Sequence, residues 1–263
     1  MKRFAVLLSL VAALFLRGAE TLRIADATGS DGSAVTALLL KLASERKGLE
    51  VSFRRLEAGL ALEKFDAGDL DIVLVNGGDL PEKYRKTAFR YAVNAGIAVV
   101  SIKNPLRGVS FKDLRLILDI PKPNWEVVGG DVANIRRYGV SDRNGVQVGM
   151  EMLKLEARSR ETLLLSSMNE AVLLAENDPA ALVWGPFMAE LPITVVALAV
   201  DGVSPTRAAI RSGRYPLTVS RFAVSSAAPS GAAKEFLARL RTGEFAALVE
   251  EDGEVPELPE LPK

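Results

Sequence analysis

The sequence predicts an α/β protein of two lobes, in which each lobe is a mainly parallel sheet flanked by helices. Apolar segments of strand length alternate along the chain with segments of helical periodicity. Several strand segments are apolar almost throughout, which is typical of parallel strands that helices cover on both faces. The 263 residues also exceed what one small core needs, and they suit two lobes of roughly 100 to 150 residues each.

Strand and helix segments alternate in the first hundred residues after the N-terminal segment. The clearest helix has apolar residues at helical spacing, at Val35, Leu38, Leu39 and Leu42. In chain order the sequence predicts a strand at 21–26, a helix at 34–46, a strand at 49–53, a helix at 60–67, and strands at 70–75 and 96–102. These elements form the first part of lobe 1.

The middle of the chain repeats the alternation and predicts lobe 2. Ser110 is a suitable N-cap for a helix that ends near residue 118. After it we expect a strand at 135–140, a helix at 146–155, a strand at 161–165, a helix at 169–176 and a strand at 181–184. Trp125 and Trp184 are expected to pack inside this lobe, and Arg136 and Arg137 to lie on a solvated strand edge.

The last third is expected to return to lobe 1, through residues 197–200, a strand at 219–224 and a helix at 232–241. Lobe 1 then comprises 20–101 and 195–249, and lobe 2 comprises 102–194. The end of the chain, 250–263, is acidic and rich in proline, so it lacks the apolar surface that folding needs. We expect a solvated, disordered tail, and docking of this tail on a partner is the alternative.

Residues 1–19 have the pattern of a secretory signal peptide. Lys2 and Arg3 are cationic, and the run 4–16 is apolar apart from one serine. That run is shorter than the roughly 18 to 20 residues that span a bilayer. An uncleaved membrane anchor is the alternative, since Arg17 suits cleavage after Ala19 poorly. Because the chain has no cysteine, it cannot be a lipoprotein, and we expect a soluble periplasmic protein.

The composition excludes several classes of function. The 33 basic and 33 acidic residues balance, and the signal peptide contains only basic ones, so no basic surface for nucleic acid is indicated. The chain has neither histidine nor cysteine, which removes Ser-His-Asp and Cys-His nucleophiles and the usual zinc ligands. We therefore expect no enzyme, no metal and no cofactor. Hydrolysis by two carboxylates is the enzymatic alternative, although no pair of acids stands out by its spacing.

Two motif-bearing segments carry a family resemblance. One runs from Asn104-Pro-Leu-Arg-Gly through Asn124-Trp125 to Gly145-Val-Gln-Val-Gly-Met-Glu-Met-Leu153, and the other holds Gly202-Val-Ser-Pro-Thr206 and Tyr215-Pro-Leu217. Their order and spacing resemble the periplasmic phosphate-binding proteins of ABC transporters, over nearly the whole mature chain. The resemblance implies a type II periplasmic binding protein fold, in which two lobes close on a solute.

The loop before the helix at 34–46 is the first candidate for solute binding. Gly29 and Gly32 let the backbone approach a ligand closely, and the hydroxyls of Ser30 and Ser33 can donate hydrogen bonds. A helix N-terminus offers free N–H groups and a partial positive charge, so it attracts anions. Simple capping of the helix explains the same residues. Asp31 disfavours an anion if its side chain points inward.

The second candidate is the turn formed by Asp142, Arg143, Asn144 and Gly145. The resemblance places the anion-binding loop of the family here, yet much of its chemistry is changed in this chain. The arginine of the family falls on Val140, one serine on Asn144 and the threonine on Val146. Arg143 stands at a glycine position of the family, where it either supplies a guanidinium or is an exposed loop arginine.

Asn76 is the third candidate. The resemblance places a proton-accepting aspartate of the family at this position, and Asp71 at a position that we expect to be structural. An amide donates as well as accepts, so Asn76 does not reject a fully deprotonated anion such as sulfate. With two or three charge-assisted hydrogen bonds of about 1.5 to 3 kcal/mol lost, tight capture of phosphate through the contacts of the family is not expected.

The resemblance and the residues together lead to one functional expectation. We expect an exported, monomeric solute-binding protein that holds a small anion, such as a phosphate-like one, or another polar solute between its lobes. Its other partner is the membrane permease of an ABC transporter. The alternative is an envelope interaction or scaffold protein that keeps the fold without a solute, which the changes at Val140, Asn144 and Val146 suggest.

Overall fold

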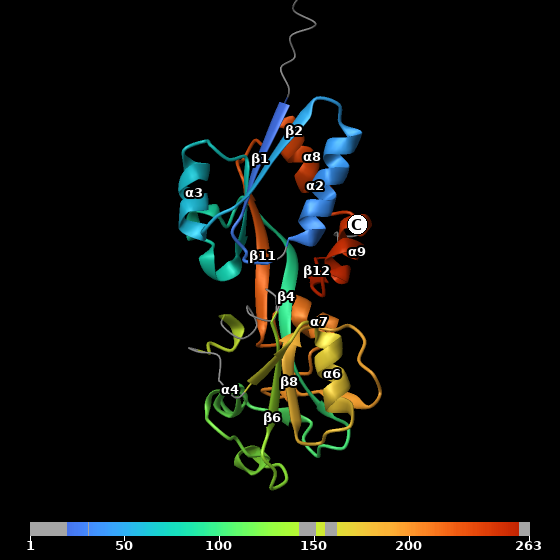
Figure 1. Ribbon diagram of the computed structural model, residues 1–263. Helices are drawn as coiled ribbons and strands as arrows, with labels where there is room; N and C mark the ends of the chain where they lie inside the picture. Colours follow the sequence, from blue (N-terminus) through green and yellow to red (C-terminus); the bar gives the residue numbers. More distant parts are fainter. Residues whose placement is uncertain (1–19, 31, 142–150, 156–161, 258–263) are drawn as a thin grey trace, which may run out of the picture.

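Two lobes built on one sheet make up the chain, as Figure 1 shows with lobe 1 above lobe 2. This computed structural model describes residues 20–30, 32–141, 151–155 and 162–257. Within these residues ten strands form a single sheet that runs through both lobes, and two further short strands pair with each other. The expected two-lobe α/β architecture is therefore present.

Lobe 1 is a mixed, partly parallel sheet with helices on both faces. Its strands are β1 (Glu20–Asp26), β2 (Leu49–Arg55), β3 (Ile72–Asn76), β11 (Thr218–Ser225) and β12 (Val255–Pro256). Its helices are α2 (Ser33–Glu45), α3 (Ala58–Asp66), α8 (Gly231–Arg239) and α9 (Gly243–Glu251), with short 3-10 turns η1 (Gly77–Asp79) and η2 (Glu82–Tyr84). β1 pairs in parallel with β2 and β3, and β11 pairs antiparallel with β3.

Side chains alternate between the two faces of β1, and each face has its own core. Leu22 and Ile24 pack with α2, α8 and α9, whereas Ala25 packs with α3. This alternation is the period of two that strands impose. The face with Leu22 and Ile24 is apolar, whereas the face with Ala25 also carries Arg23, which pairs with Asp71.

Lobe 2 repeats this arrangement on a smaller scale. Its elements are β5 (Gly108–Val109), α4 (Phe111–Asp119), η3 (Trp125–Val128), β6 (Arg136–Val140), β7 (Thr162–Leu165), α6 (Met168–Glu176), β8 (Ala181–Pro186), β9 (Val195–Ala197), β10 (Ala199–Val200) and α7 (Arg207–Arg211). β6 pairs in parallel with β7 and β8. Ser110 caps α4 by accepting from the backbone of Asp113, as its position predicts. Trp125 and Trp184 are both buried in the core of this lobe.

The long strand β4 (Ala88–Ser101) connects the lobes. Its first half pairs with β11 and β12, and its second half pairs with β8 and β9. Side chains from 93–100 and 195–217 join the core of lobe 2. The sequence analysis assigns these two segments to lobe 1 instead. The difference arises because β4 continues from one lobe into the other, so no loop marks the boundary at this strand.

The expectation of a disordered tail at 250–263 is wrong for its first part. Residues up to 257 are part of the fold: α9 extends to Glu251, and β12 adds to the edge of β4, with Val255 almost fully buried. We call residues 252–257 the C-terminal strap. It is held by an ion pair between Arg90 and Glu257 and by the backbone of Glu257, which donates to Tyr91. Acidic and proline-rich composition alone did not reveal these partners.

The expectation that Arg137 lies on a solvated strand edge is also wrong. Its side chain is buried, and Nη1 donates to the carbonyl oxygens of Leu118 at 2.8 Å and Ile120 at 2.9 Å. These carbonyls end α4, where a cation is favoured by the helix dipole. Arg136 does lie at the surface, and it pairs with Asp178.

Some expectations fall on parts of the chain that the structure leaves undescribed. The signal peptide at 1–19 lies outside the described residues, as does the first half of the helix expected at 146–155; in its second half, residues 153–155 are not helical. Among the helices that are described, none has the length and hydrophobicity needed to cross a membrane.

Candidate functional site

The loop after β1 folds around the buried carboxylate of Asp26. The backbone N–H and the hydroxyl of Thr28 both donate to Asp26 Oδ1, at 2.9 and 2.7 Å. Since the hydroxyl proton of Thr28 goes to Asp26, the 3.0 Å contact between the Ser30 and Thr28 hydroxyls leaves Ser30 as the donor. The predicted binding residue Ser30 thus donates within the loop rather than into open solvent.

Gly29 and Gly32 have the backbone freedom that the sequence indicates. Their φ angles are 72° and 63°, in the left-handed region that glycine adopts without strain. At Gly32 a Cβ atom would lie only 2.9 Å from Asp26 Oδ2, so glycine also allows a close approach here. Because Gly32 is the N-cap of α2 and has no side chain, the helix lacks a local side-chain cap.

A carboxylate from the far end of the chain occupies the N-terminus of α2. The hydroxyl of Ser33 donates to Asp252 Oδ1, and the backbone N–H of Ala34 donates to Asp252 Oδ2 at 2.8 Å. Free N–H groups and the helix dipole favour a negative group at this position. The predicted anion position on Ser33 therefore holds an anion that belongs to the protein itself.

Asn76 lies at the end of β3 and makes hydrogen bonds to neighbouring groups of the protein. Its Nδ2 donates to the carbonyl oxygen of Thr28 at 3.1 Å, and its Oδ1 accepts from Arg221 Nη1 at 2.8 Å. Glu151 of lobe 2 approaches the same amide, with Oε2 at 3.4 Å from Nδ2. Asn76 thus connects both lobes, and its amide orientation is determined by Thr28 and Arg221. Asp71 is structural, as expected, and pairs with Arg23 at 2.9 Å.

Arg221 is a buried cation that the sequence analysis does not identify. It lies on β11 where the register with β4 shifts, an irregularity that typically redirects a side chain. Its Nε and Nη2 donate to Glu254 Oε1 at 3.1 and 2.8 Å, and Nη1 donates to the Thr28 carbonyl at 2.8 Å. Burial lowers the pKa of Arg221, but the charges of Glu254, Tyr91 and Asp26 and the hydrogen bond to Glu254 together outweigh burial and raise it. The guanidinium is therefore charged and fully coordinated by protein groups.

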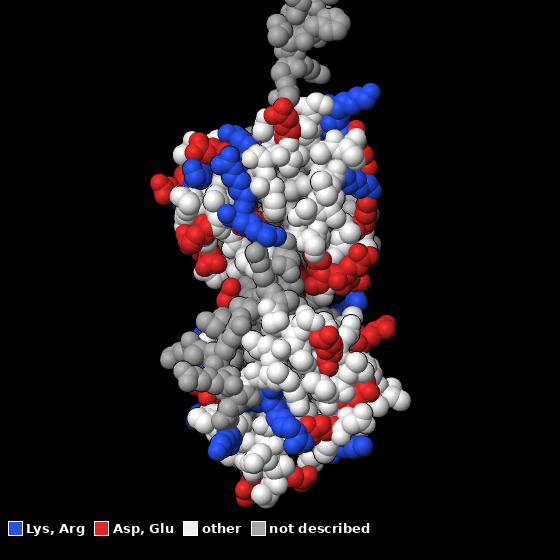
Figure 2. All heavy atoms as spheres, viewed as in Figure 1, with Lys and Arg blue, Asp and Glu red and all other residues white. Residues whose placement is uncertain are grey.

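Acidic groups gather on one side of this boundary region. Figure 2 shows acidic side chains gathered at the lower right of lobe 1, where Figure 1 draws α9. A pocket of about 240 Å³ opens beside the loop after β1, and it is lined by Asp26, Gly29, Ser30, Arg55, Leu56 and Glu57. Among the described residues, the lobe 1 side of the boundary thus carries acidic side chains as well as Arg55, and it is not a purely cationic surface.

The second predicted loop cannot be compared with the structure. Asp142, Arg143, Asn144 and Gly145 lie outside the described residues. The residues just before them are described: Val140 is buried in the core of lobe 2, and the hydroxyl of Ser141 donates to the carbonyl oxygen of Leu165 at 2.9 Å. Val140, at the arginine position of the family, therefore supplies no donor to a solute.

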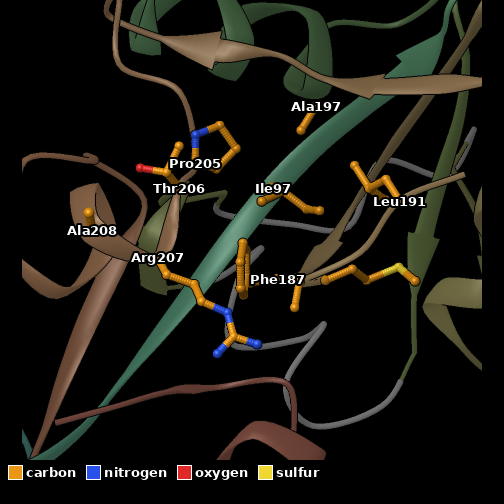
Figure 3. Close-up of a pocket in the computed structure, with 10 residues that line it drawn as sticks. Ile97, Phe187, Leu191, Ala197, Pro205, Thr206, Arg207 and Ala208 are labelled. Atoms are coloured by element: carbon orange, nitrogen blue, oxygen red, sulfur yellow. The ribbon is translucent and has the colours of Figure 1, made fainter. Parts of the chain in front are cut away.

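Two other features of the described residues bear on ligand chemistry. An apolar pocket of about 530 Å³ lies beside β4, and Figure 3 shows Ile97, Phe187 and Leu191 among its lining residues. Arg207 is the charged residue of this lining, and it pairs with Glu250. Within the described part of the chain, no group of three or more acidic residues is arranged to hold a metal ion.

The sequence analysis did not identify Arg221, Asp252 or Glu254. Of the three, only Arg221 has a sequence context that could have indicated its role. Arg221 is the one charge in the strand Thr218–Ser225, so a buried partner could have been expected for it. The two acids lie in a segment whose composition indicates solvent exposure. Their partners are 33 or more residues away along the chain, beyond the reach of local patterns.

Comparisons with known proteins agree with this architecture. No family model matches the chain. The phosphate-binding protein PstS of Bacillus subtilis is 25% identical over 241 residues, which cover 87% of this chain and 80% of that protein. A solved structure of a possible phosphate-binding protein from Planctomyces limnophilus has a TM-score of 0.76 at 19% identity, covering 92% of this chain and 94% of the other. An ABC-type phosphate transport receptor from Vibrio cholerae has a TM-score of 0.69 at 17% identity, covering 90% and 100%.

The two kinds of comparison support different statements. The solved structures share little sequence with this chain, so they show the fold alone. The Bacillus subtilis relative extends along most of the chain, and it confirms the resemblance on which the sequence analysis rests. The chain thus resembles the phosphate-binding receptors of ABC transporters over most of its length, and its fold is that of the two-lobe periplasmic binding proteins.

Proposed function

We propose that this protein is an exported solute-binding protein, which captures a small anion or another small polar solute between its lobes and presents it to the membrane permease of an ABC transporter. The observation that carries the proposal is the similarity to a phosphate-binding protein along 87% of the chain. The signal-like segment 1–19 supports export. The relatives are named as binding proteins, and we propose no chemistry on the solute.

The fold supports a binding cycle of this kind. The strand β4 is continuous between the lobes, so bending near its middle would move one lobe toward the other as a hinge. The loop after β1, the end of β3 and the N-terminus of α2 lie together on the lobe 1 side. The carboxyl ends of strands in open α/β sheets are the usual place for a ligand. For lobe 2, the proposed contacts are Asp142, Arg143, Asn144 and Gly145.

One observation favours a second candidate, a scaffold or interaction protein of the envelope without a solute. The lobe 1 groups that would contact an anion are bonded within the protein: Ser33 and Ala34 to Asp252, and Asn76 to Thr28 and Arg221. In a pure scaffold these bonds would be permanent. The two candidates differ in whether any solute stabilises the protein.

A thermal-shift screen of residues 20–263 separates the candidates. The panel contains phosphate, sulfate, phosphonates, molybdate and small carboxylates. A solute at 100 times its Kd adds about 2.7 kcal/mol to the free energy of unfolding, which is roughly 5 to 10 °C for a chain of this size. Ser33→Ala should reduce the shift, whereas Ser44→Ala, at the other end of α2, should not. A flat response over the whole panel would favour the scaffold.

A further inference from the structure

The C-terminal strap places two carboxylates on two electropositive groups of lobe 1. Asp252 accepts from the Ser33 hydroxyl and the Ala34 N–H at the start of α2, and Glu254 accepts two hydrogen bonds from Arg221. Arg221 is completely buried, and the side chain of Glu254 is 10% exposed. Both acids come from one short segment, which crosses the boundary side of lobe 1.

The strap is packed against the rest of lobe 1 and is hydrogen-bonded to it. Val255 is paired with Val93 of β4 and is almost fully buried, and the carbonyl oxygen of Pro256 accepts from Arg211 Nε at 3.1 Å. These contacts fix the backbone just after Glu254, and the N–H groups of Gly253 and Glu254, which donate to the carbonyl oxygens of Glu250 and Val249, fix it just before. They hold Asp252, two residues earlier, within reach of the helix N-terminus.

We propose that Asp252 is a specificity-determining residue, an internal competitor that holds the lobe 1 anion position until a solute anion displaces it. This inference rests on the proposed function, because it assigns a role at the same site. A carboxylate bonded to Ser33 and Ala34 uses the donors that a phosphate or sulfate oxygen would use, and its charge repels a second anion.

Capping of α2 is the simpler explanation of the contact. It does not by itself explain why the capping carboxylate comes from the C-terminal strap. The N-cap residue of α2 is Gly32, and the cap comes from a residue 218 or 219 positions away in the sequence. The other six described α-helices take an N-terminal cap from their own N-cap side chain. Capping and competition also make different predictions, since only competition changes the affinity for a solute.

Competition by Asp252 raises the apparent Kd for an anion, because only the molecules in which Asp252 has left the site can bind. If the fraction of such molecules is f, the apparent Kd equals the intrinsic Kd divided by f. If about nine to ninety-nine molecules have Asp252 bonded for each open one, f is about 0.1 to 0.01, and removal of the side chain should tighten binding by about ten- to a hundredfold. Neutral or cationic solutes should gain nothing from the same change.

The test compares the wild-type protein, residues 20–263, with Asp252→Ala by calorimetric titration of sulfate and phosphate at constant ionic strength. Glu251→Ala is the matched control, because Glu251 is the adjacent residue, is exposed and loses the same charge. We expect Asp252→Ala to bind at least one of the two anions ten times more tightly or better, and Glu251→Ala to bind like the wild type. Adding Ser33→Ala to the Asp252 variant should remove the gain.

Asp252→Asn guards against a variant that fails to fold, since the amide oxygen still accepts from Ala34 without carrying charge. It should show an intermediate gain. Equal affinities in the wild type, Asp252→Asn and Asp252→Ala would overturn the inference while leaving a solute-binding function intact. Absence of anion binding in all of them would overturn the inference as well, and a flat response of the wild type to the whole solute panel would then remove the proposed function too.

Discussion

Breaking the ion pair between Arg221 and Glu254 should destabilise the protein strongly. The side chain of Arg221 is 1% exposed, and Glu254 Oε1 lies 2.8 Å from Nη2. Glu254→Gln keeps the shape and removes the charge, so the guanidinium loses the carboxylate that accepts from its Nε and Nη2. A buried pair broken on one side typically costs about 3 to 5 kcal/mol. Urea unfolding followed by circular dichroism measures this loss.

Two comparisons make the test specific to the buried charge. Glu251→Gln, three residues earlier and exposed, should change the free energy of unfolding by less than about 0.5 kcal/mol. The double variant Arg221→Met with Glu254→Leu should recover most of the loss, because replacement of a whole buried pair by apolar groups is often neutral or stabilising. A loss below about 1 kcal/mol for Glu254→Gln would refute the reasoning, since it would mean that the guanidinium does not depend on its partner.

Three further predictions follow from single contacts. Gly139→Ala should cost about 1 to 3 kcal/mol in urea unfolding, because the added Cβ would lie 2.8 Å from Cζ2 of Trp184. Tyr215→Phe should leave stability unchanged or raise it by about 1 kcal/mol in the same assay, because burial raises the pKa of Tyr215 and its hydroxyl has no partner among the described residues. Hydrogen bonds from Arg136 lower the pKa of Asp178, so the stability advantage of the wild type over Asp178→Asn should be complete at neutral pH and vanish as the pH falls below 3.8. Since Arg136 is largely exposed, that advantage should stay below about 1 kcal/mol, and urea midpoints at several pH values measure it.

The architecture could be predicted because burial leaves a periodic trace in the sequence. The apolar run at 70–75 became β3, and the helical spacing at 34–46 became α2 with a shift of one residue at each end. The strand expected at 96–102 is only the second half of β4. Its first half contains Arg90 and Asn94, and the sequence analysis assigned no element to it. Pairing with β11 and β12 satisfies its backbone there, and no local pattern reports such distant partners.

The place of Gly32 and Ser33 in the fold could be predicted from the sequence, and their hydrogen-bond partners could not. Gly32 and Ser33 are indeed at the start of α2, as their residue types indicate. What binds there depends on Asp252, more than two hundred residues later in the chain. The same separation hid the role of Glu254, since an acid in a proline-rich segment has the composition of a solvated tail until a buried cation is found for it.

In the proposed binding mode, the contact of Asp252 with the N-terminus of α2 determines which solutes bind with useful affinity. A carboxylate tethered beside its donors acts at an effective concentration of about a millimolar or more, so a free anion at micromolar concentration cannot displace Asp252 through Ser33 and Ala34 alone. Such a solute needs additional contacts from lobe 2. The described part of lobe 2 offers none near Val140, which is buried and apolar. In the proposed binding mode, the affinity of an anionic solute should therefore depend on Arg143. Arg143→Ala should weaken anion binding more in the wild type, where Asp252 competes, than in the variant that lacks Asp252, which the same calorimetric titration would show.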